Sequence, residues 1–197
     1  MNEITNNLIN LIPEGSRVLD LGCGDGLLLK ELVEKKKINP LGLEFDINCI
    51  ENCVKNKVPV LQMDIGTGLK IFADKQFDLA VLHFTIQEVS DPLQLYREML
   101  RIAHSCIIVF SNFAHWTIRL KLLKHGKMPV TDNLPHHWYD TPNIHLMSVV
   151  DLLELCKGEG AKVIHAEYFG DSMIDHLLIK SGFKNVGACS ALIHMQS

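Results

Sequence analysis

The sequence predicts an α/β protein whose sheet has seven mostly parallel strands and helices on both faces. Short β-like runs alternate with helical patterns from residue 16 onwards, which is the order expected of βαβ units. Residues 77–83 form a near-continuous apolar run, typical of a strand that is covered on both faces. The 197 residues suffice for one domain with a buried core, and no linker or internal repeat divides them. We therefore expect a single domain over 1–197.

The expected strands and helices follow in a regular order. A glycine loop separates the first strand from the first amphipathic helix, and Asp91 with Pro92 forms the N-cap and first residue of a later helix. The expected strands are 17–21, 40–45, 58–63, 77–83, 106–110, 161–169 and 187–194. The expected helices are 27–37, 47–56, one that begins at Pro92, and 148–159.

The composition excludes several classes of protein. The formal net charge of −4 argues against a general nucleic-acid binder, because lysines and arginines supply most of the non-specific affinity for phosphates. No stretch approaches the roughly 18 consecutive apolar residues of a membrane span, and the N-terminus lacks the features of a signal peptide. The six cysteines are scattered and none forms C-x-x-C, so we expect reduced thiols in a cytoplasmic protein with no nucleic-acid or membrane partner.

The strongest local signal is the glycine loop after the first strand. It reads D-x-G-x-G-x-G over residues 20–26, with an acid two residues before the first glycine. Glycines allow a tight turn and the close approach of a ligand, and the helix that follows presents backbone N–H groups. The dinucleotide fingerprint is G-x-G-x-x-G, so the spacing disfavours a nicotinamide cofactor. The carboxylate of Asp20 instead favours a ligand with a positively charged amino group.

This loop resembles motif I of class I S-adenosylmethionine-dependent methyltransferases. The resemblance implies a Rossmann-like class I methyltransferase fold with an antiparallel last strand, and S-adenosyl-L-methionine or S-adenosyl-L-homocysteine as cofactor. Glu44 is then placed to accept the ribose hydroxyls, and Phe45 to pack on the adenine. Asp64 is placed to meet the adenine amino group, with Ile65 lining the ring. The alternative is that Asp20 and Asp64 only cap loops while Glu44 is solvated. The predicted cofactor-binding residues are Asp20, Gly22, Cys23, Gly24, Asp25, Gly26, Glu44, Phe45, Asp64, Ile65 and His83.

His83, at the end of the fourth strand, is the one weak candidate for a catalytic group. An imidazole titrates near neutral pH and can act as a general base for an oxygen or carbon acid. The alternative is a histidine that ends an apolar strand with its ring hydrogen-bonded. The N/D-P-P-Y/F motif that often serves methyl transfer to nitrogen is absent after this strand, where the chain reads H-F-T-I-Q-E-V. The sequence therefore assigns no catalytic mechanism.

The alternation stops between residues 111 and 147, in a segment rich in His, Trp, Tyr, Pro and Asn that is too long for an ordinary turn. Residues 112–127 are typical of an amphipathic helix closed by glycine. The segment is predicted to be either a lid over the cofactor cleft or a surface for docking a partner protein. Aromatic residues and arginine are common anchors of interfaces, and the docking candidates are Trp116, Arg119, Trp138 and Tyr139. Neighbouring histidines on an irregular segment are weak evidence for a metal site, and we predict no metal ion from His136, His137 and His145.

The sequence resembles the methionine biosynthesis protein MetW family over nearly its whole length. The glycine loop marks only the methyltransferase superfamily, whereas pieces from the segment 111–147 are more specific. The matching pieces are R-V-L-D-L-G-C-G-D-G (17–26), F-S-N-F-A-H-W (110–116), G-K-M-P-V-T (126–131) and W-Y-D-T-P-N-I-H-L (138–146).

The resemblance implies a methyltransferase-fold protein that serves as an accessory or regulatory partner of homoserine O-acetyltransferase. A cofactor made from the end product of the methionine pathway would suit a sensor. Two other functions remain open: an S-adenosylmethionine-dependent methyltransferase acting on a small molecule, and a nicotinamide oxidoreductase, which the glycine spacing disfavours.

Overall fold

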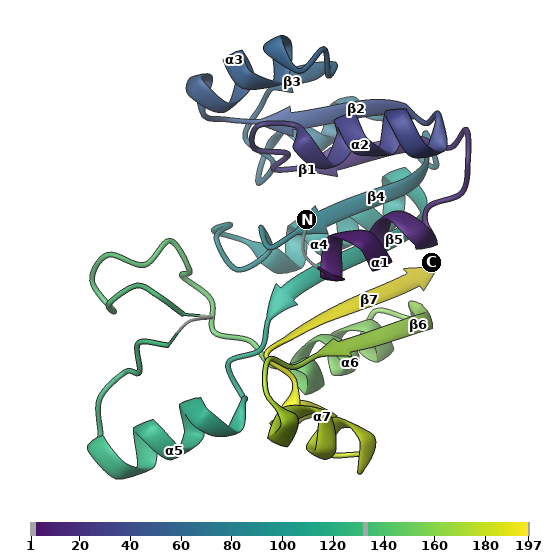
Figure 1. The fold of residues 1–197 in the computed structure, drawn as a ribbon. Coiled ribbons are helices and arrows are strands. Elements are labelled where there is room, and N and C mark those ends of the chain that lie inside the picture. Colours follow the sequence, from purple (N-terminus) through teal and green to yellow (C-terminus); the bar gives the residue numbers. More distant parts are fainter. Residues whose placement is uncertain (1–2, 132–133, 197) are drawn as a thin grey trace.

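A seven-stranded sheet with the order β3-β2-β1-β4-β5-β7-β6 forms the centre of the computed structural model, which describes residues 3–131 and 134–196 (Figure 1). Strands β1 to β5 pair in parallel, and β7 lies antiparallel between β5 and β6. The predicted fold class, with its antiparallel last strand, is therefore confirmed. The strands are β1 (Arg17–Leu21), β2 (Asn39–Glu44), β3 (Val60–Gln62), β4 (Phe77–His83), β5 (Ala103–Ser111), β6 (Lys162–Phe169) and β7 (Ser190–Gln196).

Helices cover both faces of the sheet because the buried strands carry apolar side chains on both sides. The helices are α1 (Glu3–Leu11), α2 (Leu27–Lys36), α3 (Ile47–Lys55), the short 3₁₀ helix η1 (Gly68–Ile71), α4 (Pro92–Ile102), α5 (Trp116–His125), α6 (Val149–Gly158), α7 (Met173–Lys180) and α8 (Lys184–Gly187). Val18, Val81 and Val109 pack with residues of α1, α2 and α3. The alternate strand residues Leu19 and Leu82 pack with α4 and α6. None of the helices within 3–131 and 134–196 is long and apolar enough to cross a bilayer.

Local capping explains where several helices begin. Asp91 accepts a hydrogen bond from the backbone N–H of Gln94, and Pro92 is the first residue of α4, as predicted. Ser148 forms a capping box with Asp151 at the start of α6. Helices α1, η1, α7 and α8 were not predicted from the sequence. Short helices depend largely on burial against the rest of the fold, although Ser172 and Asp175 form a capping box at the start of α7.

The segment 111–147 leaves the carboxyl end of β5 and extends away from the sheet (Figure 1). Its helix α5 is shorter than the predicted 112–127, because residues 112–115 form a turn before Trp116. Only Ile118 of this helix is buried, and Leu123 is 85% exposed. Residues 1–2 and 197 of the predicted domain, and 132–133 of this segment, lie outside the described residues.

Candidate functional site

The glycine loop connects β1 to α2 at the carboxyl edge of the sheet. Gly22, Gly24 and Gly26 all have positive φ angles, of 76°, 53° and 72°. At Gly22 a side chain is also excluded by space, because a Cβ atom there would lie 2.6 Å from Cγ2 of Thr85. The backbone N–H of Gly22 donates to the carbonyl of Leu43 at 2.9 Å. The loop therefore adopts a backbone conformation that L side chains rarely adopt, as the spacing predicted.

A cavity of about 450 Å³ lies beside this loop and brings together Asp20 and His83 with the loop residues. The Oδ1 atom of Asp20 is buried and has no hydrogen-bond partner within the described chain. Burial, and secondarily the charge of Glu44, raises the pKa of Asp20 to about 7. A buried carboxylate without a partner destabilises a fold unless a ligand compensates it. The cavity is lined by Thr5, Asp20, Gly22, Cys23, Gly24, Asp25, Leu27, Leu28, Glu31 and His83.

The Nε2 atom of His83 is the second buried polar atom at this cavity. This atom has no hydrogen-bond partner in the part of the chain that the structure describes, so the ring is not fully hydrogen-bonded. Burial lowers the pKa of His83, which favours the neutral imidazole. The ring meets Phe84 edge-on, with centroids 4.9 Å apart. A neutral imidazole with a free ring nitrogen can accept a proton or a hydrogen bond from a bound molecule.

The carboxylate of Glu44 orients the glycine loop. Oε2 accepts the backbone N–H of Gly24 at 2.9 Å, and Oε1 accepts the N–H groups of Phe45 and Asp46 at 2.7 and 2.9 Å. A carboxylate has about four acceptor positions, so one remains for a ligand. The side chain of Phe45 is 71% exposed beside it. Both residues lie where the second strand ends, as predicted.

Of the remaining predicted residues, Cys23 and Asp25 line the cavity, whereas Asp64 and Ile65 do not. Asp64 accepts the backbone N–H of Gly66 at 2.8 Å and so caps its own loop, and its contact with an adenine amino group stays a prediction. Ile65 is buried and lines a separate cavity near α4. Within the loop, the Cys23 thiol lies 3.8 Å from the Cys53 thiol. The carboxylate of Asp25 accepts from the Asn52 amide at 2.9 Å.

The docking candidates in the segment 111–147 occupy two kinds of position. Trp138 and Tyr139 are 75% and 68% exposed and contact each other edge-on, with centroids 5.7 Å apart. Trp116 instead points inward, and its indole N–H donates to the carboxylate of Asp175 at 2.7 Å. The guanidinium of Arg119 donates to the carbonyl of Ala114, within the same segment. The described residues of 111–147 contribute nothing to the lining of the Asp20 cavity, and the lid and docking interpretations both stay predictions.

The structure also gathers a cluster that the sequence analysis did not identify. His115, Asp175 and Cys189 come from three distant parts of the chain and meet in the protein interior. Among the residues described, none of His136, His137 and His145 belongs to a comparable group. Only the F-A-H-W piece of the sequence drew attention to this region, and nothing in it indicated the other two members.

Comparison with known proteins decides the family. The model of the protein family described as "Methionine biosynthesis protein MetW" matches residues 3–192 of the chain. The chain belongs to the MetW family. It is also 32% identical, over 196 residues, to the bifunctional methionine biosynthesis protein MetXA/MetW of Rhodopirellula baltica. That alignment covers 95% of this MetW-family chain and 31% of the relative, so the chain spans about a third of the length of that protein.

Solved structures place the MetW-family chain in the class I methyltransferase fold. A SAM dependent methyltransferase from Archaeoglobus fulgidus superposes with a TM-score of 0.71 at 18% identity, covering 98% of this chain and 93% of the other. The [4+2]-cyclase SpnF superposes with a TM-score of 0.70 at 16% identity, covering 98% of this chain and 80% of that one. Since the same fold occurs in a cyclase, it does not by itself define a reaction.

Proposed function

We propose that this MetW-family chain binds S-adenosylmethionine at the glycine-loop cavity and acts in methionine biosynthesis as an accessory and regulatory partner of homoserine O-acetyltransferase. The observation that carries the binding proposal is the buried carboxylate of Asp20, whose Oδ1 has no hydrogen-bond partner in the described chain. A ligand ammonium group would supply the missing hydrogen bond and the opposite charge. S-adenosylmethionine has such a group at the end of its amino-acid part.

The ribose end of the ligand fits the other side of the loop. Glu44 is held in place by three backbone N–H groups and keeps an acceptor position for a hydroxyl. Phe45 offers an exposed aromatic ring next to it. In open α/β sheets, ligands bind outside the carboxyl ends of the strands, which is where both residues lie.

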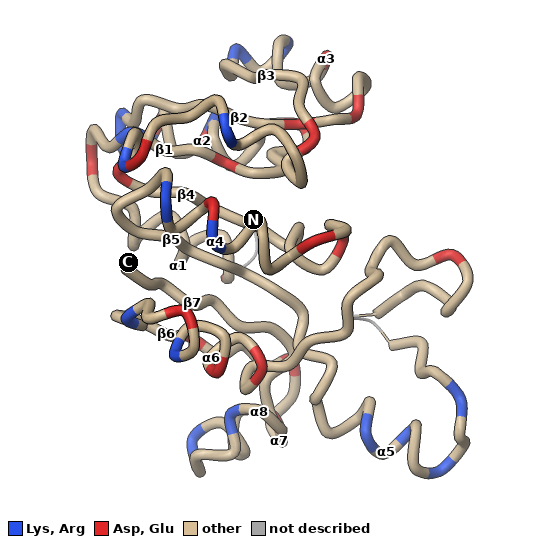
Figure 2. The backbone as a smooth tube through the Cα atoms, turned by 180° about the vertical axis from the view of Figure 1, so that it is seen from behind, with Lys and Arg blue, Asp and Glu red and all other residues tan. Residues whose placement is uncertain are grey.

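The partnership is supported by the relative from Rhodopirellula baltica, which joins MetXA and MetW in one chain. Fusion of two proteins in one organism is consistent with their association in another. The exposed pair Trp138 and Tyr139, on a segment that extends from the sheet, would supply the aromatic anchors of such a contact (Figure 1). Figure 2 shows Lys and Arg on α5, a helix that contains no Asp or Glu, and we expect it to face an acidic part of the partner.

A buried glutamine joins the two regions. Gln87 lies in the turn after β4, close to Thr85 of the glycine-loop contact, and is 1% exposed. Its backbone carbonyl accepts hydrogen bonds from the backbone N–H groups of Ile144 and His145 at 2.9 and 3.0 Å. Its side-chain carbonyl accepts a hydrogen bond from the backbone N–H of Ser111 at 3.1 Å. A ligand that shifts the turn after β4 would therefore act on the segment 111–147. Regulation further requires that the cofactor bind the free and partner-bound states with different affinities.

The binding proposal is tested by calorimetry with two ligands. S-adenosylmethionine carries both adenosine and the amino-acid part, whereas 5′-methylthioadenosine keeps the adenosine alone. Asp20→Asn should lower the affinity for S-adenosylmethionine at least tenfold and leave the affinity for methylthioadenosine unchanged. Glu44→Gln should lower the affinity for both ligands. The control is Asp78→Asn, which removes an acid that pairs with Arg17 on the opposite edge of the sheet. Absence of S-adenosylmethionine binding to the unmodified chain would contradict the proposal.

The partnership is tested by measuring homoserine acetylation by the acetyltransferase with and without this chain, over a titration of S-adenosylmethionine. We expect a change in rate, co-elution of the two proteins, and dependence on the cofactor. Trp138→Ala with Tyr139→Ala should abolish co-elution but leave cofactor binding intact. Phe183→Ala, which removes another exposed aromatic ring outside the segment, is the matched control.

A second candidate function is methyl transfer to a small molecule. The unpartnered Nε2 of His83 favours it, because this nitrogen is buried at the same cavity as Asp20 and would be placed to accept a proton from an acceptor hydroxyl. Transfer of a radiolabelled methyl group to pathway metabolites, and its loss in His83→Gln, would favour this function.

A further inference from the structure

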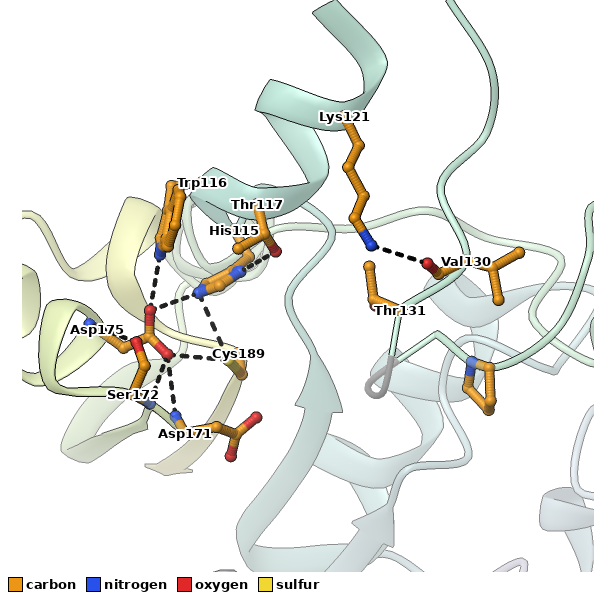
Figure 3. Close-up of a pocket in the computed structure, with 11 residues that line it drawn as sticks. His115, Trp116, Thr117, Lys121, Val130, Thr131, Asp171, Ser172, Asp175 and Cys189 are labelled. Atoms are coloured by element: carbon orange, nitrogen blue, oxygen red, sulfur yellow. Dashed lines mark hydrogen bonds and ion pairs between the residues drawn. The ribbon is translucent and has the colours of Figure 1, made fainter. Parts of the chain in front are cut away.

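A second cavity, of about 520 Å³, lies between the start of α5, the residues Val130, Thr131 and Pro135, and α7 (Figure 3). Figure 3 shows the side chains of His115, Asp175 and Cys189 converging at its inner wall. They are 5%, 2% and 4% exposed. Such a concentration of imidazole, carboxylate and thiol beside an open cavity is uncommon in an apolar interior, and none of these groups belongs to the glycine-loop site.

One ligand atom from each of the three side chains lies within 4.8 Å of the other two. His115 Nε2 is 3.0 Å from Asp175 Oδ1, and Cys189 Sγ is 3.5 Å from that nitrogen and 3.7 Å from Asp175 Oδ2. Zinc bonds of about 2.0 Å to nitrogen or oxygen and about 2.3 Å to sulfur place tetrahedral ligands roughly 3.3 to 3.6 Å apart. His115 and Cys189 contact different oxygens of Asp175, so an ion between them would require the carboxylate to present one oxygen, or both, to the same point.

Outer hydrogen bonds hold two of the three groups in this orientation. The Oγ1 atom of Thr117 lies 2.8 Å from Nδ1 of His115, which leaves Nε2 facing the other two groups. The carboxylate of Asp175 accepts the indole N–H of Trp116 at 2.7 Å and the backbone N–H of Ser172 at 2.9 Å. Ligating histidines and carboxylates in metal sites are commonly fixed by partners of this kind.

We propose that His115, Asp175 and Cys189 bind one Zn²⁺ ion whose fourth coordination position opens into the cavity. On binding, the thiol of Cys189 releases its proton to solvent, and neutral His115 carries its proton on Nδ1, toward Thr117. The ion then takes the place of the contact between Nε2 and the Asp175 carboxylate. This proposal departs from the sequence-based expectation that the chain binds no metal ion, and it is independent of the proposed cofactor and partner.

The donor set selects the type of metal. One imidazole, one carboxylate and one thiolate suit zinc, whereas Mg²⁺ and Ca²⁺ prefer oxygen ligands alone. Three protein ligands with an open fourth position are typical of zinc sites that exchange a water or a substrate atom. The adjoining cavity carries hydroxyl groups of Thr117, Thr131 and Ser172, so the fourth ligand would be water or a small polar molecule.

The experiment is a Co²⁺ titration of the full chain after treatment with a chelator, with Co²⁺ as the spectroscopic substitute for Zn²⁺. We expect one equivalent to bind, with a thiolate-to-cobalt band in the near ultraviolet and visible bands of tetrahedral cobalt, and Zn²⁺ to displace it. Cys189→Ser should lose the near-ultraviolet band and bind at least tenfold more weakly. Cys49→Ser, which alters a thiol outside the cluster, should behave as the unmodified chain.

A measurement on the unmodified chain keeps the proposal testable if a variant fails to fold. X-ray absorption of the zinc-loaded protein should show one sulfur neighbour per zinc, with nitrogen and oxygen making up the rest. Two sulfur neighbours would place the ion at Cys23 and Cys53, whose thiols are 3.8 Å apart, and would overturn the proposal. Failure of the unmodified chain to bind one equivalent, or unchanged binding in a folded Cys189→Ser, would show a hydrogen-bonded structural cluster instead.

Discussion

The backbone N–H of Gly24 donates to the carboxylate of Glu44 at 2.9 Å, which joins the glycine loop to the end of β2. Glu44 is therefore more than a candidate ligand of a ribose. It also fixes the loop that forms one wall of the Asp20 cavity, so the two ends of the proposed cofactor site are mechanically connected. A change at Glu44 is expected to alter both the binding of adenosine and the shape of the loop.

The stability of the chain should depend on pH through Asp20. The pKa of Asp20 is about 7 in the folded protein, whereas an unfolded aspartate titrates near 4, so the folded state holds an extra proton between these values. The free energy of unfolding contributed by this group therefore falls as pH rises from about 4 to 7. Asp20→Asn removes this titration, and its stability relative to the unmodified chain should rise by roughly 1–4 kcal/mol between pH 4.5 and pH 8.

Urea unfolding at the two pH values measures this difference, in the absence of ligand. All other titrating groups are common to the two proteins and cancel in the comparison. A difference in unfolding free energy that is the same at both pH values would show that Asp20 is ionised in the folded protein throughout this range.

The affinity for S-adenosylmethionine should itself depend on pH. Binding an ammonium group requires ionised Asp20, so below pH 7 each complex must release a proton and the affinity should fall by about tenfold per pH unit. Above about pH 8 the amino group of the ligand loses its own proton, and the affinity should fall again. Calorimetry from pH 5.5 to 8.5 checks this profile. The affinity for methylthioadenosine, which lacks the amino group, should not fall below pH 7. The affinity of Asp20→Asn for S-adenosylmethionine should not fall there either.

Alanine substitutions at Gly22 and Gly24 should distinguish the cost of backbone strain from the cost of steric overlap with a neighbouring side chain. Gly22→Ala places a Cβ atom 2.6 Å from Thr85 at a φ of +76°, so it should destabilise the fold by about 2–4 kcal/mol and abolish cofactor binding. At Gly24, with a φ of +53°, a Cβ atom would meet nothing within 4 Å. Gly24→Ala should therefore lower the stability of the fold by only about 1 kcal/mol. Thermal unfolding of both variants is the measurement, and equal losses would contradict the role of Thr85.

Gln87 should couple the cofactor site to the segment 111–147. Gln87→Ala keeps the backbone carbonyl contacts with residues 144–145 but removes two side-chain hydrogen bonds, one accepted from the N–H of Ser111 and one donated to the carbonyl of His145. We expect a cost of about 1–3 kcal/mol in stability. We expect S-adenosylmethionine still to bind within a few-fold of its normal affinity, while its effect on the rate of the partner acetyltransferase disappears. Gln94→Ala, on the surface of α4, is the control. If the cofactor effect persists in Gln87→Ala, the coupling passes through other contacts.

The strands and the glycine loop were predictable because their signals are local. A buried parallel strand such as 77–83 needs an apolar run, and a loop with three left-handed residues needs glycine, whatever the rest of the chain does. The family also followed from short matching pieces. Helix α7 had a local signal, the capping box of Ser172 and Asp175, which the sequence-based prediction did not use. The four-residue helix α8 was not predicted because so short a helix depends on packing with the rest of the chain.

The sequence by itself therefore determined the fold class, the family and the residue types of the glycine-loop site. Only the tertiary structure decided that Oδ1 of Asp20 and Nε2 of His83 are buried at one cavity, because burial depends on segments far apart in the chain. The same holds for His115, Asp175 and Cys189, which are separated by up to 74 residues and meet only when α5, α7 and β7 pack together. Chemistry that arises from long-range packing leaves no spacing in the sequence from which it can be read.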